Sequence, residues 1–261
     1  MTSDVNGRDP SYLTDLVVAP SCLLMYVVYH LLLARRVYRK PETTVIGITR
    51  RARRDWVYGI ASDQNYAIIA VQTLRNWLMA ASMLGSVAIS LSVGIMALVA
   101  TLSRTREDGE IAFLSGWGWL FRMKIACLIT CFIGAFISFL EVMRYLKHLT
   151  FFITTIAPRD CNRKVKERIA SNVHIAASMI NRAALCHTIG LRVLLFSFPV
   201  LVWLFTVWLM PVFTLLLLLV FQCRDDESEE YGGMTASAFA RDVEQQSQDE
   251  EVEPLLLAHE P

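Results

Sequence analysis

The side chains best suited to chemistry in this 261-residue chain gather near the ends of long apolar runs. Gln72, Arg75 and Asn76 precede one run, and Glu141 and Arg144 follow another, at spacings of three and four residues. Side chains at these spacings share one face of a helix. A carboxylate beside a guanidinium can form a charge-assisted hydrogen bond. The candidate binding set is Gln72, Arg75, Asn76, Lys124, Glu141, Arg144, His148 and Arg192.

Two interpretations of this polar set stay open. In the first, the polar groups satisfy one another and anchor helix ends against phosphate headgroups, an ordinary use of long cationic side chains at an interface. In the second, they line a cytosolic vestibule that binds an anion or a lipid headgroup. The second interpretation predicts a water-accessible cavity joining Gln72, Arg75 and Asn76, whereas the first predicts a solid core.

Motifs of established catalytic mechanism are missing from the sequence. It contains no His-Glu-x-x-His, no glycine-rich phosphate loop and no Gly-x-Ser-x-Gly. Cys127 and Cys131 lie four residues apart, but no His or acid joins them at a matching depth, so we interpret both as packing residues. We therefore expect no enzymatic activity, no cofactor and no metal.

Four apolar runs must position these side chains. They cover residues 16–33, 77–102, 125–140 and 193–221. About 20 apolar residues cross a bilayer as a helix. The last run is too long for a straight crossing and contains Pro199 and Pro211, so we expect one kinked or tilted helix there rather than two spans. The runs predict an all-α polytopic membrane protein built as a four-helix transmembrane bundle.

Lys and Arg residues orient this bundle. Nine lie in residues 34–76 and nine in residues 141–192, against four between the second and third runs and one before the first. Because short loops rich in Lys and Arg are retained in the cytosol, both segments are predicted to be cytosolic. Both termini would then be non-cytosolic, and the first helix would be an uncleaved anchor.

Two cytosolic segments are expected to meet the membrane surface. Residues 35–54 combine eight Lys or Arg with apolar side chains, which favours an anionic bilayer over nucleic acid as the partner. Residues 163–188 repeat apolar side chains at helical spacing, which predicts an amphipathic helix on the bilayer. The alternative is a helix packed against the first loop. We expect anionic lipid as a partner, expect no nucleic acid, and leave homo-oligomerisation open.

Small residues mark faces for helix packing. Ser82, Ser86, Ser90 and Gly94 recur every four residues in the second span, and Ala81 and Gly85 widen that strip. In the third span a comparable face is formed by Cys127, Cys131, Gly134, Ala135 and Ser138. Close backbone contact through such faces drives helix association in lipid. We predict tight packing of the second and third spans; the alternative is that the serines line a pathway for a polar solute.

The C-terminal residues 223–261 differ sharply in charge from the rest, with twelve acidic and two basic residues. This composition predicts disorder. Residues 231–234 and 251–256 look like tyrosine-based and acidic dileucine sorting signals, which cytosolic adaptors read. A non-cytosolic tail could not present them, and the charge count outweighs them.

Several stretches of the chain resemble domain of unknown function 599, a eukaryotic family of four-span integral membrane proteins. The matching residues are Tyr29 and His30; 41–47, Arg53 and Trp56; 70–76, with the sequence Ala-Val-Gln-Thr-Leu-Arg-Asn; Lys124; Arg144 and His148; and 190–192, Pro199 and Trp203. The resemblance implies the four-span architecture and no established activity. Glu141 and Lys147 depart from the uncharged residues of plant members.

The predicted organisation has three parts: a short N-terminal segment (1–14), a four-span membrane domain (15–222) and a disordered acidic tail (223–261). The predicted function is that of a non-enzymatic integral membrane protein whose basic cytosolic face binds anionic lipid or partner proteins. The alternative is a small oligomeric transporter or channel for a polar or anionic solute. The membrane is expected to be the plasma membrane or an endomembrane.

Overall fold

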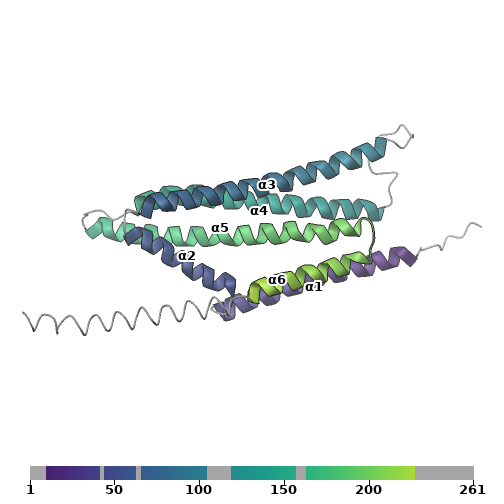
Figure 1. Ribbon diagram of the computed structural model, residues 1–261, viewed down its shortest axis with the longest axis horizontal. Helices are drawn as coiled ribbons and strands as arrows, with labels where there is room; N and C mark the ends of the chain where they lie inside the picture. The colour runs from purple at the N-terminus through teal and green to yellow at the C-terminus, as the bar shows by residue number, and fades with distance from the viewer. Residues whose placement is uncertain (1–9, 42–43, 63–65, 105–118, 157–162, 227–261) are drawn as a thin grey trace, which may run out of the picture. The chain divides into compact units, whose positions relative to one another are not determined.

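The structure of the protein is a computed structural model that describes residues 10–41, 44–62, 66–104, 119–156 and 163–226. Within these residues, the regular structure is entirely helical (Figure 1). The helices are α1 (Pro10–Arg39), α2 (Val45–Ser62), α3 (Tyr66–Arg104), α4 (Trp119–Thr155), α5 (Arg163–Trp203) and α6 (Leu209–Asp226). Most of the predicted N-terminal segment and of the acidic tail lies outside the described residues.

Four helices are long and apolar enough to cross a membrane. These candidate spans are Thr14–Arg39, Tyr66–Thr101, Trp119–Thr155 and Glu167–Trp203. They confirm the predicted all-α membrane architecture with four long apolar helices. At 1.5 Å per residue, each of the last three would extend about 55 Å, against about 30 Å of hydrocarbon. Nearly half of each helix must therefore lie outside the hydrocarbon.

The chain divides into two compact units. The first comprises Met1–Val28 and Ala52–Leu218, and the second comprises Tyr29–Arg51 and Leu219–Pro261. α3, α4 and α5 belong entirely to the first unit, where α4 packs against both α3 and α5 (Figure 1).

The fourth apolar run is not the single kinked helix that we expected. α5 ends at Trp203, residues 204–208 form a turn, and α6 begins at Leu209. Pro211 explains the break, because its ring would clash with the carbonyl of Val207 in a continuous helix. In the first turn of α6 its missing N–H is not needed, and the Met210 N–H donates to the Val207 carbonyl at 3.2 Å.

The predicted amphipathic helix at residues 163–188 forms the first part of α5. Its apolar side chains Val173, Ala176 and Ile180 are buried. Arg53 of α2 donates from Nε to Oδ1 of Asn181 at 3.0 Å. These contacts agree with the alternative in which this helix packs against the first loop rather than on the bilayer.

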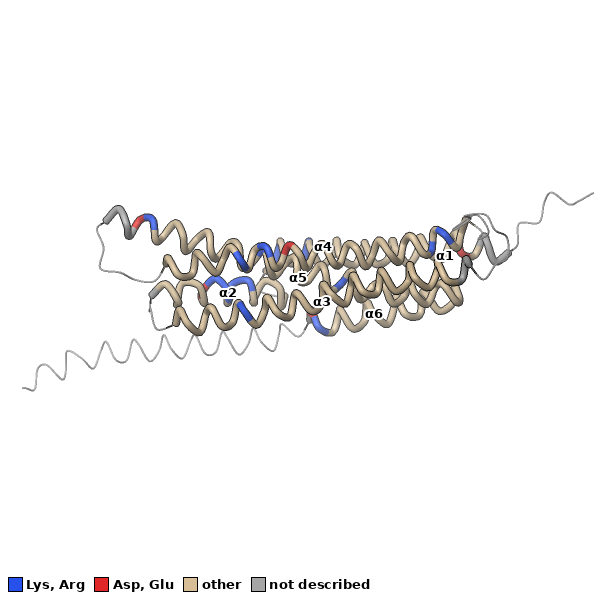
Figure 2. Tube along the Cα trace, turned by 90° about the horizontal axis from the view of Figure 1, so that it is seen from above, with Lys and Arg blue, Asp and Glu red and all other residues tan. Residues whose placement is uncertain are grey.

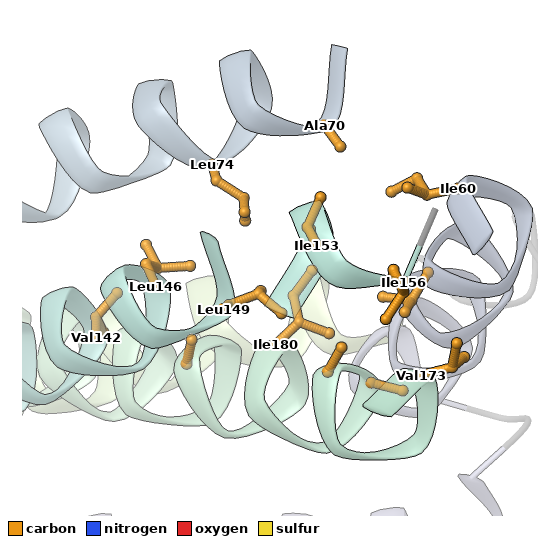
Figure 3. Close-up of a cluster of buried hydrophobic side chains, with 14 of the residues drawn as sticks. Ile60, Ala70, Leu74, Val142, Leu146, Leu149, Ile153, Ile156, Val173 and Ile180 are labelled. Carbon is orange, nitrogen blue, oxygen red and sulfur yellow. The ribbon is translucent and has the colours of Figure 1, made fainter. Parts of the chain in front are cut away.

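An aliphatic core joins α2, α3, α4 and α5 in the first unit (Figure 3). Its buried residues are Val57, Ile60, Ala70, Leu74, Ala81, Val142, Leu146, Leu149, Ile153, Ile156, Val173, Ala176, Ala177, Ile180 and Ala183. It lies where α3 begins, α4 ends and α5 begins, the end of the unit that adjoins the two Lys- and Arg-rich segments. We call this the basic end; Figure 2, with Lys and Arg in blue and Asp and Glu in red, shows long stretches of helix that carry no charged residue.

An aromatic core occupies the other end of the first unit, which we call the turn end because it adjoins the turn at residues 204–208. It joins α1, α3, α4, α5 and α6. Its buried residues are Ala19, Cys22, Ala88, Leu128, Phe132, Ala135, Phe139, Leu194, Phe196, Val200, Trp203 and Met210.

α4 and α5 approach each other closely at Gly190. A Cβ placed there would be 3.0 Å from the Cβ of Ser138 and 3.2 Å from the ring of Phe139. A Cβ at Gly134 would be 3.8 Å from Val193 of α5. The small-residue face of α4 therefore receives α5, where we expected α3.

Tight packing between α3 and α4, the second and third spans, is confirmed, and it uses the side of the predicted strip that carries Ala81 and Gly85. A Cβ at Gly85 would lie 3.5 Å from the Cβ of Phe139 in α4. Ser86 and Ser90, in contrast, are exposed, and a Cβ at Gly94 would meet nothing within 4 Å. Most of the predicted serine strip therefore faces away from the helix bundle.

Candidate functional site

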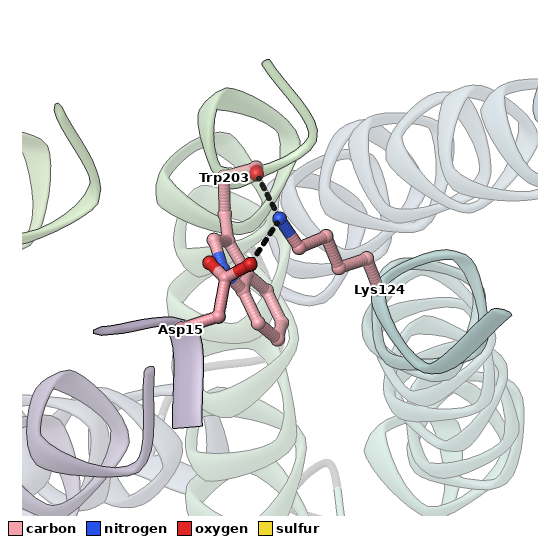
Figure 4. A network of polar contacts seen from close by, with 3 residues as sticks. All are labelled: Asp15, Lys124 and Trp203. Atoms are coloured by element: carbon pink, nitrogen blue, oxygen red, sulfur yellow. Dashed lines mark hydrogen bonds and ion pairs between the residues drawn. The ribbon is translucent and has the colours of Figure 1, made fainter. Parts of the chain in front are cut away.

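Three residues from three helices form a closed polar network at the turn end (Figure 4). Lys124 Nζ of α4 lies 3.2 Å from Oδ2 of Asp15 in α1 and donates to the backbone carbonyl of Trp203 in α5 at 3.1 Å. The indole Nε1 of Trp203 donates to the other carboxylate oxygen, Oδ1, at 2.8 Å. The ammonium also lies 5.0 Å from the centre of the Trp203 ring.

Burial makes this network costly to break. The side chains of Lys124 and Asp15 are only 12% and 10% exposed, and an unpaired charge in such a place costs several kcal/mol. Here both carboxylate oxygens and the ammonium have partners. The carbonyl of Trp203 belongs to the last residue of α5, where helix carbonyls lack intrahelical donors and cations are favoured. Lys124 thus forms an ion pair with Asp15 and, at the same time, caps the C-terminus of α5.

Sequence reasoning missed this network, although a signal was present. Lys124 is in the candidate set, but its two partners in the structure, Asp15 and Trp203, are not. Asp15 directly precedes the first apolar run, and Lys124 directly precedes the third. Both runs are predicted to start on the same side of the membrane, so the two charges should lie at a similar depth. Opposite charges at the same depth of two spans predict an ion pair.

The amides and cation on α3 form a local pair. Arg75 Nη2 donates to Oε1 of Gln72 at 3.0 Å, as their spacing predicts. Gln72, Arg75 and Asn76 are all exposed along one face of α3. This exposure agrees with helix anchoring better than with a buried vestibule.

The acid and cation on α4 form a second local pair. Arg144 donates from Nε to Oε2 of Glu141 at 3.0 Å, and its Nη2 reaches the same oxygen. Its guanidinium also lies 5.1 Å from the Tyr145 ring. The side chains of Arg144 and Glu141 are 58% and 39% exposed, and His148 is exposed one turn further on. Glu141 therefore pairs within its own helix.

The predicted polar set occupies three levels of the bundle. Lys124 precedes Arg144 by 20 residues on α4, about 30 Å along a helix. Arg192 precedes Trp203 by 11 residues, about 16 Å along α5, which places it about midway between the other two levels. Arg192 is half-buried, and its backbone carbonyl accepts a hydrogen bond from the Tyr26 hydroxyl at 3.0 Å.

Cations gather in the second unit where α1 ends and α2 begins. We define this basic face by its exposed residues Arg35, Arg36, Arg39, Lys40, Arg50 and Arg51. Tyr38 among them is 88% exposed. The first four cations directly follow the apolar run of α1, so they lie where that helix leaves the hydrocarbon.

Contacts between Pro41 and the start of α2 hold the two parts of the basic face together. Thr44 is buried and caps α2, since its Oγ1 accepts a hydrogen bond from the Gly47 N–H at 3.3 Å. A Cβ at Gly47 would lie only 1.9 Å from the carbonyl oxygen of Pro41. Pro41, Thr44 and Gly47 of this sequence motif are therefore explained by the contacts at the start of α2.

In the part of the chain that the structure describes, no group of three or more His, Cys, Asp or Glu residues comes together to hold a metal ion. Cys127 and Cys131 are half-buried neighbours on α4.

Comparison with known proteins places the chain in a family. Residues 17–230 match the family described as Protein of unknown function, DUF599. No curated protein and no solved structure matches the chain. The expected restriction of this family to eukaryotes is not borne out by the match. Since the match covers most of the 261 residues, the protein belongs to the DUF599 family, as its sequence motifs predicted.

Proposed function

We propose that this integral membrane protein is non-enzymatic and that its basic face binds anionic lipid headgroups. The observation that carries the proposal is the concentration of six exposed cations around the turn from α1 to α2, directly beyond an apolar span. Each cation near an anionic surface contributes about 1 kcal/mol. The exposed ring of Tyr38 among them is also typical of the headgroup level.

The contacts of Pro41 with the start of α2 favour a lipid ligand because they give the cations a defined arrangement. Thr44 and Gly47 fix the start of α2 against Pro41. The cations at the end of α1 therefore stay close to those at the start of α2. A surface of this kind attracts phosphate groups without needing a deep pocket.

Native mass spectrometry of the protein released from nanodiscs of mixed phosphatidylcholine and phosphatidylserine tests this proposal. The full-length protein should retain phosphatidylserine preferentially. The triple variant R35Q/R36Q/R39Q should lose that preference by about two orders of magnitude if each cation contributes about 1 kcal/mol. The matched control is R104Q/R106Q/R122Q, which removes three cations around the other loop. Equal retention by both triple variants would rule the proposal out.

A small anion transporter remains a second candidate function because of Arg192. Ionisable residues deep in a membrane bundle often mark a substrate path, and Arg192 is half-buried near the middle of α5. Proteoliposomes loaded with chloride or phosphate provide the test. Anion efflux that is lost in Arg192→Gln but kept in Arg182→Gln, an exposed cation on the same helix, would support transport; no efflux above empty liposomes would exclude it for these anions.

A further inference from the structure

We propose that α6 is a fifth membrane crossing, so that the two termini of this protein lie on opposite sides of the membrane. The inference concerns topology and does not depend on the proposed lipid binding. It replaces the expectation that both termini share one side.

The direction of α6 follows from its contacts with α1. Just before α6, Trp203 bonds to Asp15. Further along, Thr214 is a hydrogen-bonding neighbour of Cys22. In the second unit, the ring of Phe221 lies 6.0 Å from that of His30.

The second unit holds one further contact between α1 and α6. Tyr29 donates from its hydroxyl to Oδ2 of Asp225 at 2.8 Å. Within the first unit, residue numbers rise together from the pair Asp15 and Trp203 to the pair Cys22 and Thr214, so α6 begins parallel to α1. A helix that begins parallel to a membrane span, and that contacts the same span again near its other end, passes through the same depth of the bilayer.

The surface of α6 suits lipid. Its 18 residues extend about 27 Å, close to the hydrocarbon thickness. Seven large apolar side chains on it are 40–58% exposed: Leu209, Val212, Phe213, Leu215, Leu216, Leu219 and Val220. So many neighbouring apolar groups are unfavourable in water and ordinary in lipid.

The two ends of α6 carry the residues expected at two interfaces. The turn before it exposes Phe205 and Trp208, which are 83% and 68% exposed, and Trp is enriched where helices meet headgroups. The other end carries Arg224 and Asp225, at the level of Tyr29 and close to where α1 enters the basic face. Charges at this end explain why α6 is less uniformly apolar than the four candidate spans.

A fifth crossing changes what the acidic tail can meet. The chain beyond Asp226 then leaves the membrane on the side of the basic face, which the Lys and Arg distribution assigns to the cytosol. The sequences at residues 231–234 and 251–256, which look like sorting signals, would be exposed to cytosolic adaptors. The Lys and Arg distribution and the sorting-like sequences then agree, because a tail on the cytosolic side can present those sequences to cytosolic adaptors.

Protease protection of the full-length protein with one epitope tag at each terminus tests the crossing number. In sealed membrane vesicles of uniform orientation, protease added outside should remove one tag and leave the other intact until detergent is added. The C-terminal tag should be the accessible one when the cytosolic face is outward. Removal of both tags, or protection of both, means an even number of crossings and overturns the proposal.

The lipid-binding proposal does not affect this result, because tag accessibility depends only on topology. The variant R35Q/R36Q/R39Q should give the same pattern as the natural sequence if the helices retain their order. As a second measurement, a glycosylation sequon introduced near residue 240 should stay unmodified while one introduced at residues 105–110 is glycosylated. Glycosylation near residue 240 would also overturn the proposal.

Discussion

The aliphatic core buries fifteen Leu, Ile, Val and Ala side chains, whereas the aromatic core buries three Phe and one Trp and ends in a charged network. Their surroundings differ in the same way. Exposed Arg75, Arg144 and Lys147 flank the aliphatic core, while the aromatic core is enclosed by the apolar parts of α1, α3, α4, α5 and α6.

This difference reflects the solvent of each region. Outside the hydrocarbon, burial of apolar surface from water stabilises a core at about 25 cal/mol per Å². Within lipid that driving force is lost, and packing and buried polar bonds must hold helices together. We therefore expect large-to-small substitutions to act mainly on the aliphatic core, and polar or steric changes mainly on the aromatic core.

The largest effect is expected from Lys124→Ala. It leaves the buried Asp15 carboxylate without its cation and the Trp203 carbonyl without its donor, which should cost about 3–5 kcal/mol. The thermal unfolding midpoint in detergent should fall strongly. Arg122→Ala, at an exposed neighbouring position, is the matched control. The double variant D15N/K124M should recover part of the loss; an unchanged midpoint for Lys124→Ala would mean that the network contributes no net stability.

A slightly smaller effect is expected from Leu149→Ala in the aliphatic core. Leu149 is fully buried, and removal of a buried Leu side chain costs about 2–5 kcal/mol. Lys147→Ala on the exposed face of the same turn should change stability little. Chemical unfolding followed by Trp fluorescence measures both variants. Equal destabilisation by the two substitutions would contradict the separation between core and surface.

Glycine substitutions should have opposite signs at two positions. Gly190→Ala places a methyl group 3.0 Å from Ser138 and 3.2 Å from Phe139, so we expect a loss of about 1–3 kcal/mol from overpacking. Gly94→Ala meets nothing within 4 Å and should gain about 0.5–1 kcal/mol through helix propensity. The same unfolding measurement should rank the two variants on either side of the natural protein. A reversed order would show that α4 and α5 do not approach closely at Gly190.

The smallest effect is expected from Glu141→Gln. Its partner Arg144 is exposed and the pair lies within one helix, and exposed pairs contribute little to stability. The unfolding midpoint should be unchanged within error. A clear loss would mean that Glu141 makes a functional or intermolecular contact, which would restore it as a site residue.

Much of the architecture could be predicted from the sequence because lipid imposes a strong rule. Every backbone group in hydrocarbon must be satisfied within a helix, so long apolar runs report helices directly. The break at residues 204–208 could not be predicted from hydropathy, because the turn residues are as apolar as the helices on either side. Pro211 was visible, but its effect depended on whether it began a helix or interrupted one.

The candidate site was harder to predict because it depends on which faces meet. Spacing along one helix correctly paired Gln72 with Arg75 and brought Glu141 beside Arg144. The contact between Asp15, Lys124 and Trp203 joins residues up to 188 positions apart. Such contacts follow from the order of helices around the bundle, which hydropathy and charge counts do not contain.

The network at the turn end also constrains how this protein is made. Asp15 is synthesised first, Lys124 much later, and the Trp203 carbonyl that completes the network follows last. Until the end of α5 has been synthesised, the first and third spans carry opposite charges, but the Trp203 carbonyl and indole that complete their hydrogen bonds are missing. A nascent chain arrested before residue 203 would therefore expose an incomplete polar contact in the membrane, a feature by which quality control could distinguish unfinished molecules from finished ones.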